Sequence, residues 1–148
     1  MRVLLCAGLL TFLGAASALA DDLIKVKTDK SVAEAMDALE AAVGNAGATV
    51  FARVDHAAGA QKVGMELGDA QLLIFGNPKL GTPAMQADPL AGLYLPLKVL
   101  AYSDADGQVW LVYEDPAEML DDVEISGDAP VLGKMQGALK KLTGAAAN

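Results

Sequence analysis

His56 is the only histidine in the chain and the side chain best suited to acid–base chemistry. Imidazole changes its charge near neutral pH, so His56 is a candidate proton carrier or metal ligand. A working histidine normally has an orienting partner. Asp55 adjoins it, but neighbouring side chains in a strand point to opposite faces. Two interpretations follow: an enzyme that uses His56 as acid or base, and a histidine that caps a turn, which is the simpler of the two.

A second candidate site is the segment Asn77-Pro78-Lys79, which follows an apolar run. The Asn77 amide can both donate and accept hydrogen bonds, and Lys79 offers a positive charge to a carboxylate or phosphate. Glycine, asparagine and proline also end many strands, so a plain turn is the alternative interpretation. The predicted ligand-binding set is His56, Asn77, Lys79 and Met85.

Methionine thioethers and one imidazole can together hold monovalent copper, and the chain has six methionines, Met1 included. Met36 and Met135 fall on helical apolar stripes and are expected in the core. Met65 and Met85, with His56, remain as a ligand set for periplasmic copper handling. No Met-x-x-Met or His-x-Met motif supports this set. We therefore expect no metal site and no cofactor.

Several other chemistries lack their residue patterns. One cysteine and one histidine exclude zinc sites made of four cysteines, of two cysteines and two histidines, or of three histidines. The acidic stretch 114–124 lacks the calcium-loop spacing, and no serine stands in a G-x-S-x-G motif. Nineteen acidic residues against eleven basic ones give a net charge of -8, which disfavours nucleic-acid binding.

The first twenty residues have the three-part pattern of a secretory signal. Arg2 gives a positive start, an apolar run covers 3–16, and small residues stand at Ala18 and Ala20. The run is shorter than the ~20 residues that span a bilayer. Cleavage is expected after Ala20. Cys6 would then be lost, which leaves a cysteine-free single domain, 21–148, that we expect in the bacterial periplasm with no membrane span.

The remaining sequence predicts a mixture of strands and helices. Ser31 and Glu34 form a capping box, and apolar residues recur behind it at helical spacing as far as Val43. Asp106-Gly107 is a strong hairpin signal between two alternating runs. Strands are expected at 23–27, 48–54, 71–75, 97–102 and 108–113, with 71–75 as a central strand buried on both faces. A short helix is expected at 57–64 and a loop or broken helix at 81–92. A helix at 131–142 is expected to close the chain.

This order of elements predicts an α+β fold: a single domain with a mainly antiparallel sheet and helices on one face. Residues in the middle of the chain carry a resemblance that agrees with it. The segments Phe75-Gly76-Asn77-Pro78-Lys79, Asp88-Pro89 and 95–100 (L-P-L-K-V-L) resemble the domain of unknown function 302 family over about 28–119. The resemblance implies a β-α-β(4)-α arrangement similar to the TATA-binding-protein-like fold, and a homodimer. It implies no activity.

From these observations we expect a secreted, non-enzymatic protein. It would bind a small or amphipathic ligand in a crevice beside the sheet, or serve as an accessory protein in envelope stress. The alternatives are the enzyme that uses His56 and the copper-handling protein. We expect a small-molecule ligand and a second copy of the chain as partners, and no nucleic acid.

Overall fold

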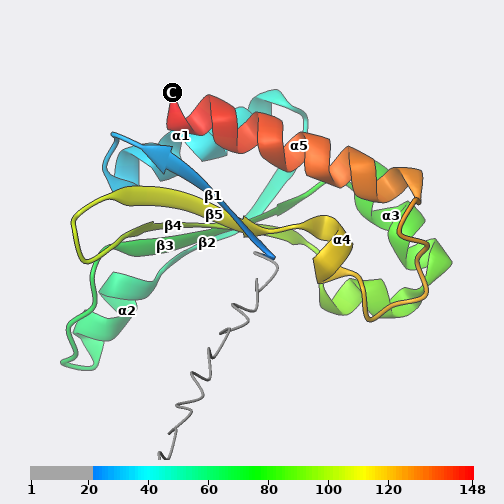
Figure 1. Cartoon of the computed structure of the whole chain (residues 1–148). Helices are drawn as coiled ribbons and strands as arrows, with labels where there is room; N and C mark the ends of the chain where they lie inside the picture. Colours follow the sequence, from blue (N-terminus) through cyan, green and yellow to red (C-terminus); the bar gives the residue numbers. More distant parts are fainter. Residues whose placement is uncertain (1–21) are drawn as a thin grey trace, which may run out of the picture.

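A five-stranded antiparallel sheet forms the centre of the fold (Figure 1). The computed structural model describes residues 22–148. The strands lie in the order β1-β5-β4-β3-β2, so β4 is central and β1 and β2 are the edges. The strands are β1 (Leu23–Thr28), β2 (Thr49–Asp55), β3 (Ala70–Gly76), β4 (Leu97–Ser103) and β5 (Val109–Glu114).

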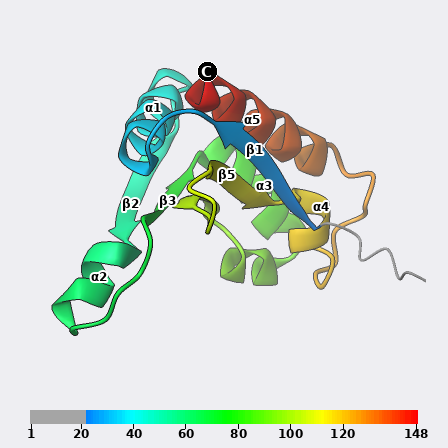
Figure 2. The same cartoon turned by 60° about the vertical axis from the view of Figure 1, so that its left-hand side comes forward.

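Two long helices, α1 (Val32–Asn45) and α5 (Pro130–Ala147), cover one face of the sheet and pack against each other (Figures 1 and 2). Alternate strand residues point toward them and form the core together with the apolar stripes of the two helices. Leu73 in β3, Val99 in β4 and Leu111 in β5 are fully buried there. We call the opposite side of the sheet the open face.

The capping box expected at the start of α1 is present. The Ser31 hydroxyl accepts a hydrogen bond from the Glu34 amide at 3.3 Å, and the Glu34 carboxylate accepts one from the Ser31 amide at 2.9 Å. Hydrogen bonds from Ser31 lower the pKa of Glu34. These contacts satisfy two amides that a helix start otherwise leaves without partners.

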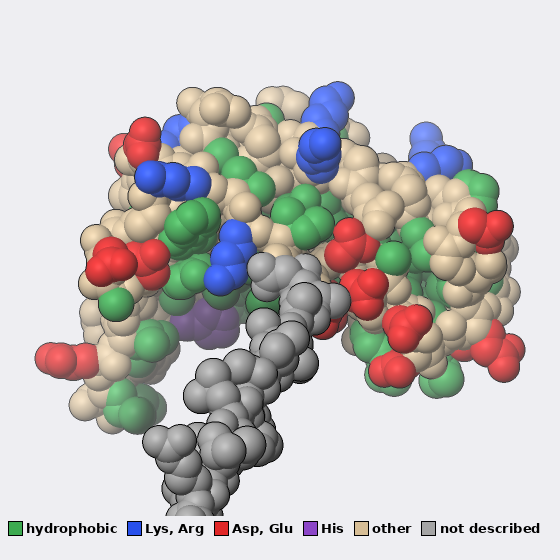
Figure 3. All heavy atoms as spheres, viewed as in Figure 1, with side chains coloured by type: hydrophobic (Ala, Val, Ile, Leu, Met, Phe, Trp, Pro, Cys, Tyr) green, Lys and Arg blue, Asp and Glu red, His purple; other side chains and the backbone are tan. Residues whose placement is uncertain are grey.

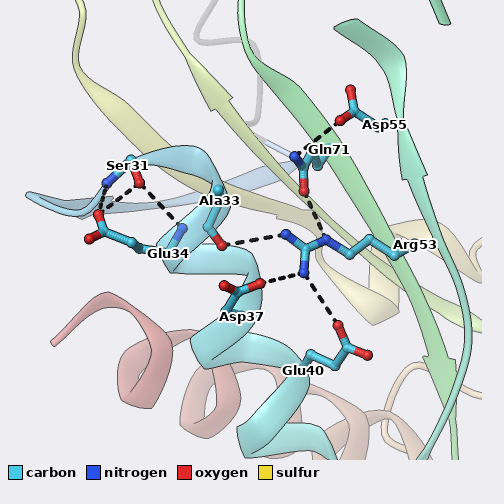
Figure 4. A network of polar contacts seen from close by, with 8 residues as sticks. All are labelled: Ser31, Ala33, Glu34, Asp37, Glu40, Arg53, Asp55 and Gln71. Atoms are coloured by element: carbon cyan, nitrogen blue, oxygen red, sulfur yellow. Dashed lines mark hydrogen bonds and ion pairs between the residues drawn. The ribbon is translucent and has the colours of Figure 1, made fainter. Parts of the chain in front are cut away.

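Arg53 attaches the edge strand β2 to α1 (Figure 4). Its guanidinium donates to the Asp37 carboxylate at 2.5 Å and to the Glu40 carboxylate at 3.4 Å, and its Nε donates to Gln71 Oε1 at 2.8 Å. The hydrogen bond to Asp37 is the main cause that raises the pKa of Arg53. The network crosses three elements, so it fixes how β2 lies against α1 and β3.

Short helices flank the open face at both ends of the sheet (Figure 1). Helix α2 (His56–Lys62) follows β2 at one end. At the other end lie α3 (Pro78–Ala87), the 3-10 helix η1 (Pro89–Leu93) and α4 (Pro116–Met119). Acidic side chains gather on the surface around α4 in Figure 3. Among residues 22–148, no helix combines the length and apolar character needed to cross a membrane.

The predicted fold class is confirmed: one α+β domain with an antiparallel sheet and the β-α-β(4)-α order, to which short helices are added. The hairpin is also confirmed, with Gly107 at a positive φ of 79° between β4 and β5. The prediction of 71–75 as a central strand buried on both faces is confirmed only in part: β3 pairs with a strand on each side, but it is not buried on both faces. β4 is central, and Leu72 and Ile74 of β3 remain partly exposed because no long helix covers the open face.

The broken helix expected within 81–92 is confirmed: α3 ends at Ala87, and η1 begins at Pro89 after a break at Asp88. The first part begins earlier than expected, at Pro78, and continues through Pro83. Proline at the first helical position favours that start, because its missing N–H has no helical partner there. The predicted signal segment and its cleavage after Ala20 fall outside the described residues.

Candidate functional site

The main candidate site is an apolar pocket of about 340 Å³ at the end of the sheet where β3 ends and β4 begins. Helix α3 forms one wall and Phe51 of β2 forms another. Apolar side chains provide most of the lining: Phe51, Pro78, Leu80, Met85, Leu95, Pro96, Leu97 and Met135. Gly76, Asn77, Gly81 and Thr82 complete it. We call this cavity the α3 pocket.

Asn77 sets the position of α3 beside the sheet. Its Oδ1 accepts a hydrogen bond from the Lys79 amide at 2.9 Å, which makes it the N-cap of the helix. Its Nδ2 donates to the Gly47 carbonyl at 3.4 Å, in the turn between α1 and β2. The Asn77 amide therefore uses its acceptor and its donor to join the end of β3 to α3 and to the turn between α1 and β2. The turn interpretation describes this contact well, although Asn77 also lies on the pocket wall.

Gly76 and Phe51 form the boundary between the pocket and the open face. β2 has a bulge between Val50 and Ala52, and Phe51 lies at this irregularity. A Cβ atom at Gly76 would lie 3.1 Å from Phe51 Cε2 and 3.6 Å from Pro96 Cβ. With a larger residue at position 76 the ring would have to shift by a few tenths of an ångström, so glycine favours this position of the ring over the backbone of β3. Phe51 is 59% exposed, and its ring is a wall of the pocket rather than part of the core.

Met85, Gly81 and Leu95 shape the interior of the pocket. A Cβ at Gly81 would meet Leu95 Cδ1 at 3.7 Å and Met85 Cε at 3.8 Å, which are ordinary contacts. Met85 is 39% exposed, whereas Met135 of α5 is fully buried and forms the floor. A flexible thioether at the mouth can adapt to a ligand, because methionine has several soft torsions.

None of the residues that line the α3 pocket has a side chain that titrates. The polar groups in its wall are the Asn77 amide and the Thr82 hydroxyl. This lining therefore contains no side chain of the kind that usually serves as a general acid or base. Clefts of this size with mostly apolar walls and a few polar groups are typical of small-molecule sites.

Asp88 holds the far end of α3 against the chain that leads into α5. Its carboxylate accepts hydrogen bonds from the Leu90 amide and the Glu124 amide, both at 2.9 Å. The bond from Glu124 is the main cause that lowers the pKa of Asp88. Close by, loss of solvent and the Asp122 carboxylate raise the pKa of Tyr94. This arrangement fixes η1 and the segment Leu95-Pro96, which forms part of the pocket wall.

The structure brings two of the four predicted ligand-binding residues together. Asn77 and Met85 both line the α3 pocket. Lys79 lies about 200° around the helix from Gly81 and lines a separate hollow that it shares with Lys134 of α5. Lys79 and Asn77 therefore do not act on one ligand in the α3 pocket, although they are close in sequence.

His56 lies at the other end of the sheet, as the first residue of α2. It lies five residues after Phe51 along β2, which corresponds to about 16 Å. Its imidazole is exposed, and among residues 22–148 no hydrogen bond to its ring is found. The Asp55 carboxylate instead caps α2 through the Ala58 amide at 2.8 Å and accepts a bond from Gln71 at 3.3 Å. The structure thus gives His56 no orienting partner.

The candidate copper ligands are not assembled either. Met65 follows α2 near His56's end of the sheet, whereas Met85 lies in the α3 pocket at the opposite end. Met36 and Met135 are fully buried, as their helical spacing predicts. In the described part of the chain, no group of three histidine, cysteine, aspartate or glutamate side chains is placed to hold a metal ion.

Sequence reasoning missed most of the pocket wall, including Phe51, Leu80 and Leu95. Phe51 belongs to an alternating strand pattern, and nothing in that pattern indicates a bulge. A glycine that ends an apolar strand, with an aromatic residue in the neighbouring strand, was the one available signal.

Comparison with known proteins agrees with the fold. A solved structure of an uncharacterised DUF302 protein from Bacillus stearothermophilus superposes with a TM-score of 0.69 at 19% identity, over 86% of this chain and 97% of that one. At that identity the likeness concerns the fold alone.

Two similar sequences are the fluoride-specific ion channels FluC 1 of Brucella suis biovar 1 and FluC 2 of Brucella melitensis biotype 1. Each is 44% identical over 102 residues, which make up 69% of this chain but only 40% and 38% of those proteins. The chain therefore spans about two-fifths of the length of the curated relatives it matches, and their name describes the longer proteins. The model of the domain of unknown function DUF302 matches residues 24–145. The chain belongs to the DUF302 family.

Proposed function

We propose that this protein binds a small, mainly apolar ligand in the α3 pocket and carries out no reaction on it. The observation that carries the proposal is the pocket itself: about 340 Å³, with walls of aliphatic, proline, methionine and aromatic side chains and only two polar groups. Burial of apolar surface would supply most of the binding free energy, at ~0.8 kcal/mol for each CH₂ group. The signal pattern at 1–20 supports a location outside the cytoplasm, in the periplasm, as part of this proposal.

A neutral fluorescent probe tests the proposal. N-phenyl-1-naphthylamine should become bright on binding, and 1-decanol should displace it. Gly81→Leu places a side chain between Leu95 and Met85 and should remove binding. The substitution also relieves the helix of a glycine, so the variant should remain folded.

Gly137→Leu is the matched control. Gly137 is an exposed glycine of α5, a Cβ added there would meet no atom within 4 Å, and it does not line the pocket. This variant should bind the probe as the wild type does. Equal binding by the wild type and the folded Gly81→Leu variant would contradict the proposal.

We also propose that two copies associate through exposed apolar side chains. Val63, which is 70% exposed, and Met65 and Leu67 lie beyond α2, and Leu93 in η1 is 79% exposed. These segments lie at opposite ends of the sheet, and each is a candidate contact surface, because exposed apolar patches often mark such surfaces. The homodimer implied by the family resemblance agrees with this association.

A further inference from the structure

We infer that the ligand of the α3 pocket is an acyl chain with a negatively charged head, such as a carboxylate, and that Lys98 receives the head. This inference rests on the proposed function and names its ligand class.

Lys98 is the nearest cation along β4 to the pocket wall. It follows Pro96 and Leu97, which both line the pocket, and it lies opposite Ile74 in β3. Gly76, two residues beyond Ile74, is the glycine beneath the Phe51 ring and Pro96. Side chains two residues apart share a face, so Lys98 projects from the open face about 7 Å along the sheet from the Phe51–Pro96 wall.

A hydrogen bond shows where the ammonium group of Lys98 lies. Lys98 Nζ donates to the Tyr94 carbonyl at 2.9 Å. That carbonyl belongs to the peptide bond between Tyr94 and Leu95, and Leu95 lines the pocket. The charged end of Lys98 therefore lies beside the pocket wall, while its stem lies along the open face.

Lys98 is not neutralised by a carboxylate. All ion pairs found among residues 22–148 involve Arg53. Glu114 borders the same hollow of the open face as Lys98, without forming an ion pair with it. A ligand carboxylate could therefore replace the single neutral carbonyl that Lys98 now contacts, and an ion pair with better hydrogen bonding would form.

The open face has a charge that suits such a head group. Lys25 and Lys27 of β1 lie opposite Val112 and Trp110 of β5 and share the open face with Lys98. Glu114 is the only acidic residue at the strand positions of this face, although the whole chain has a net charge of -8. The strand positions of this face thus carry three lysines and one glutamate, and Asp104 lies beside Lys25 and accepts a hydrogen bond from Trp110. Near Lys98 the positive charge favours an anionic over a cationic ligand.

The apolar surface also continues from the pocket past Lys98. Leu72, Leu100 and Val112 line a neighbouring hollow of about 240 Å³ that Lys98 borders. Lys98 lies between two apolar regions and is the first charge that a chain leaving the pocket would meet. A plain alkane would fill the pocket without using the charge, whereas an amphipathic ligand would use both.

The test compares decanoate with 1-decanol at pH 7.5 and low ionic strength, by displacement of N-phenyl-1-naphthylamine. For each variant the measured quantity is the ratio of the decanol dissociation constant to the decanoate dissociation constant. Lys98→Met should lower this ratio about two- to fivefold relative to the wild type, as expected for the loss of one partly exposed ion pair. Lys79→Met, on the other side of α3, should leave the ratio unchanged.

Salt gives a second measurement. Raising the salt concentration should weaken decanoate binding to the wild type and should affect the Lys98→Met variant less. If decanol binds in the pocket but the ratio is the same in the wild type and Lys98→Met, the inference about the head group is overturned and the proposed function stands. If neither compound displaces the probe, the proposed function fails and this inference fails with it.

Discussion

Arg53 shows how one side chain can determine the position of an edge strand. Its guanidinium contacts two carboxylates of α1 and the Gln71 amide of β3, so replacing it should free β2 from α1. We expect Arg53→Met to lower the free energy of unfolding by about 1 kcal/mol, because the pairs are partly exposed. Urea denaturation at low salt measures this change.

Arg53→Lys is the informative control. Lysine keeps the charge but lacks the planar fork that contacts several acceptors at once, so it should recover only part of the loss. Full recovery with lysine would show that charge alone matters, and an unchanged stability in Arg53→Met would contradict the described role of the network.

Asp88 makes stability depend on pH. Because the hydrogen bonds from the Glu124 and Leu90 amides lower its pKa in the folded state, Asp88 stabilises the fold above its unfolded pKa of about 4. This contribution is lost as the pH falls through the lowered folded-state pKa. Asp88→Ala should therefore be less stable than the wild type at pH 7, and the two proteins should converge at lower pH.

Thermal unfolding of both proteins between pH 7 and pH 2.5 measures the convergence. A difference that stays constant over this range would mean that the Asp88 carboxylate does not act as an anion in the fold. Asp106→Ala, in the hairpin turn, is a control that leaves the η1 contacts intact.

At the scale of the elements, glycine has opposite effects in a helix and in a turn. Gly137 lies on the exposed side of α5, where an added Cβ would have nothing within 4 Å, whereas Gly107 has a φ of 79° in the hairpin. Gly137→Ala should raise the free energy of unfolding by up to about 1 kcal/mol through helix propensity. Gly107→Ala should lower it, because alanine is strained at positive φ.

Chemical denaturation of the two variants provides this comparison. Stabilisation by Gly107→Ala would contradict the turn geometry, and destabilisation by Gly137→Ala would indicate a close neighbour that the structure does not have.

The elements were easier to predict than the site for a physical reason. The Ser31–Glu34 capping box and the Asp106-Gly107 turn act through local backbone contacts, so their residues predict the same structure in any surroundings. The start of α3 also has a local cause in Asn77 and Pro78. The pattern of 71–75 does not show whether something covers its second face, and the position of β3 next to the edge depends on the pairing of distant strands.

The site depends still more on distant contacts. Asn77 and Met85 were predicted because each has a recognisable chemical group, and both lie on the pocket wall. Lys79 points away from the pocket because of its position around α3, and His56 lies at the opposite end of β2. Phe51 and Leu95 were missed because an apolar side chain in a sequence does not indicate whether it fills a core or lines a cavity.

At the scale of the whole molecule, the exposed apolar segments are the proposed contacts between two copies of the chain. If copies pair through the segments beyond α2 or in η1, light scattering coupled to size-exclusion chromatography should give about twice the mass of one mature chain. A double substitution, Val63→Asp with Leu93→Asp, should give the single-chain mass while leaving the far-ultraviolet circular dichroism unchanged. A single-chain mass for the wild type at micromolar concentration would contradict the proposed pairing.

The central claim, an apolar ligand in the α3 pocket, is tested most directly by nuclear magnetic resonance of the methionine methyl groups. Met85 and Met135 line the pocket, whereas Met36 of α1 is buried in the core and Met65 is exposed beyond α2, so the protein contains its own probes and controls. Titration with 1-decanol should shift the Met85 and Met135 methyl signals and leave those of Met36 and Met65 in place. Unchanged Met85 and Met135 signals at saturating decanol, or shifts confined to Met65, would contradict the account.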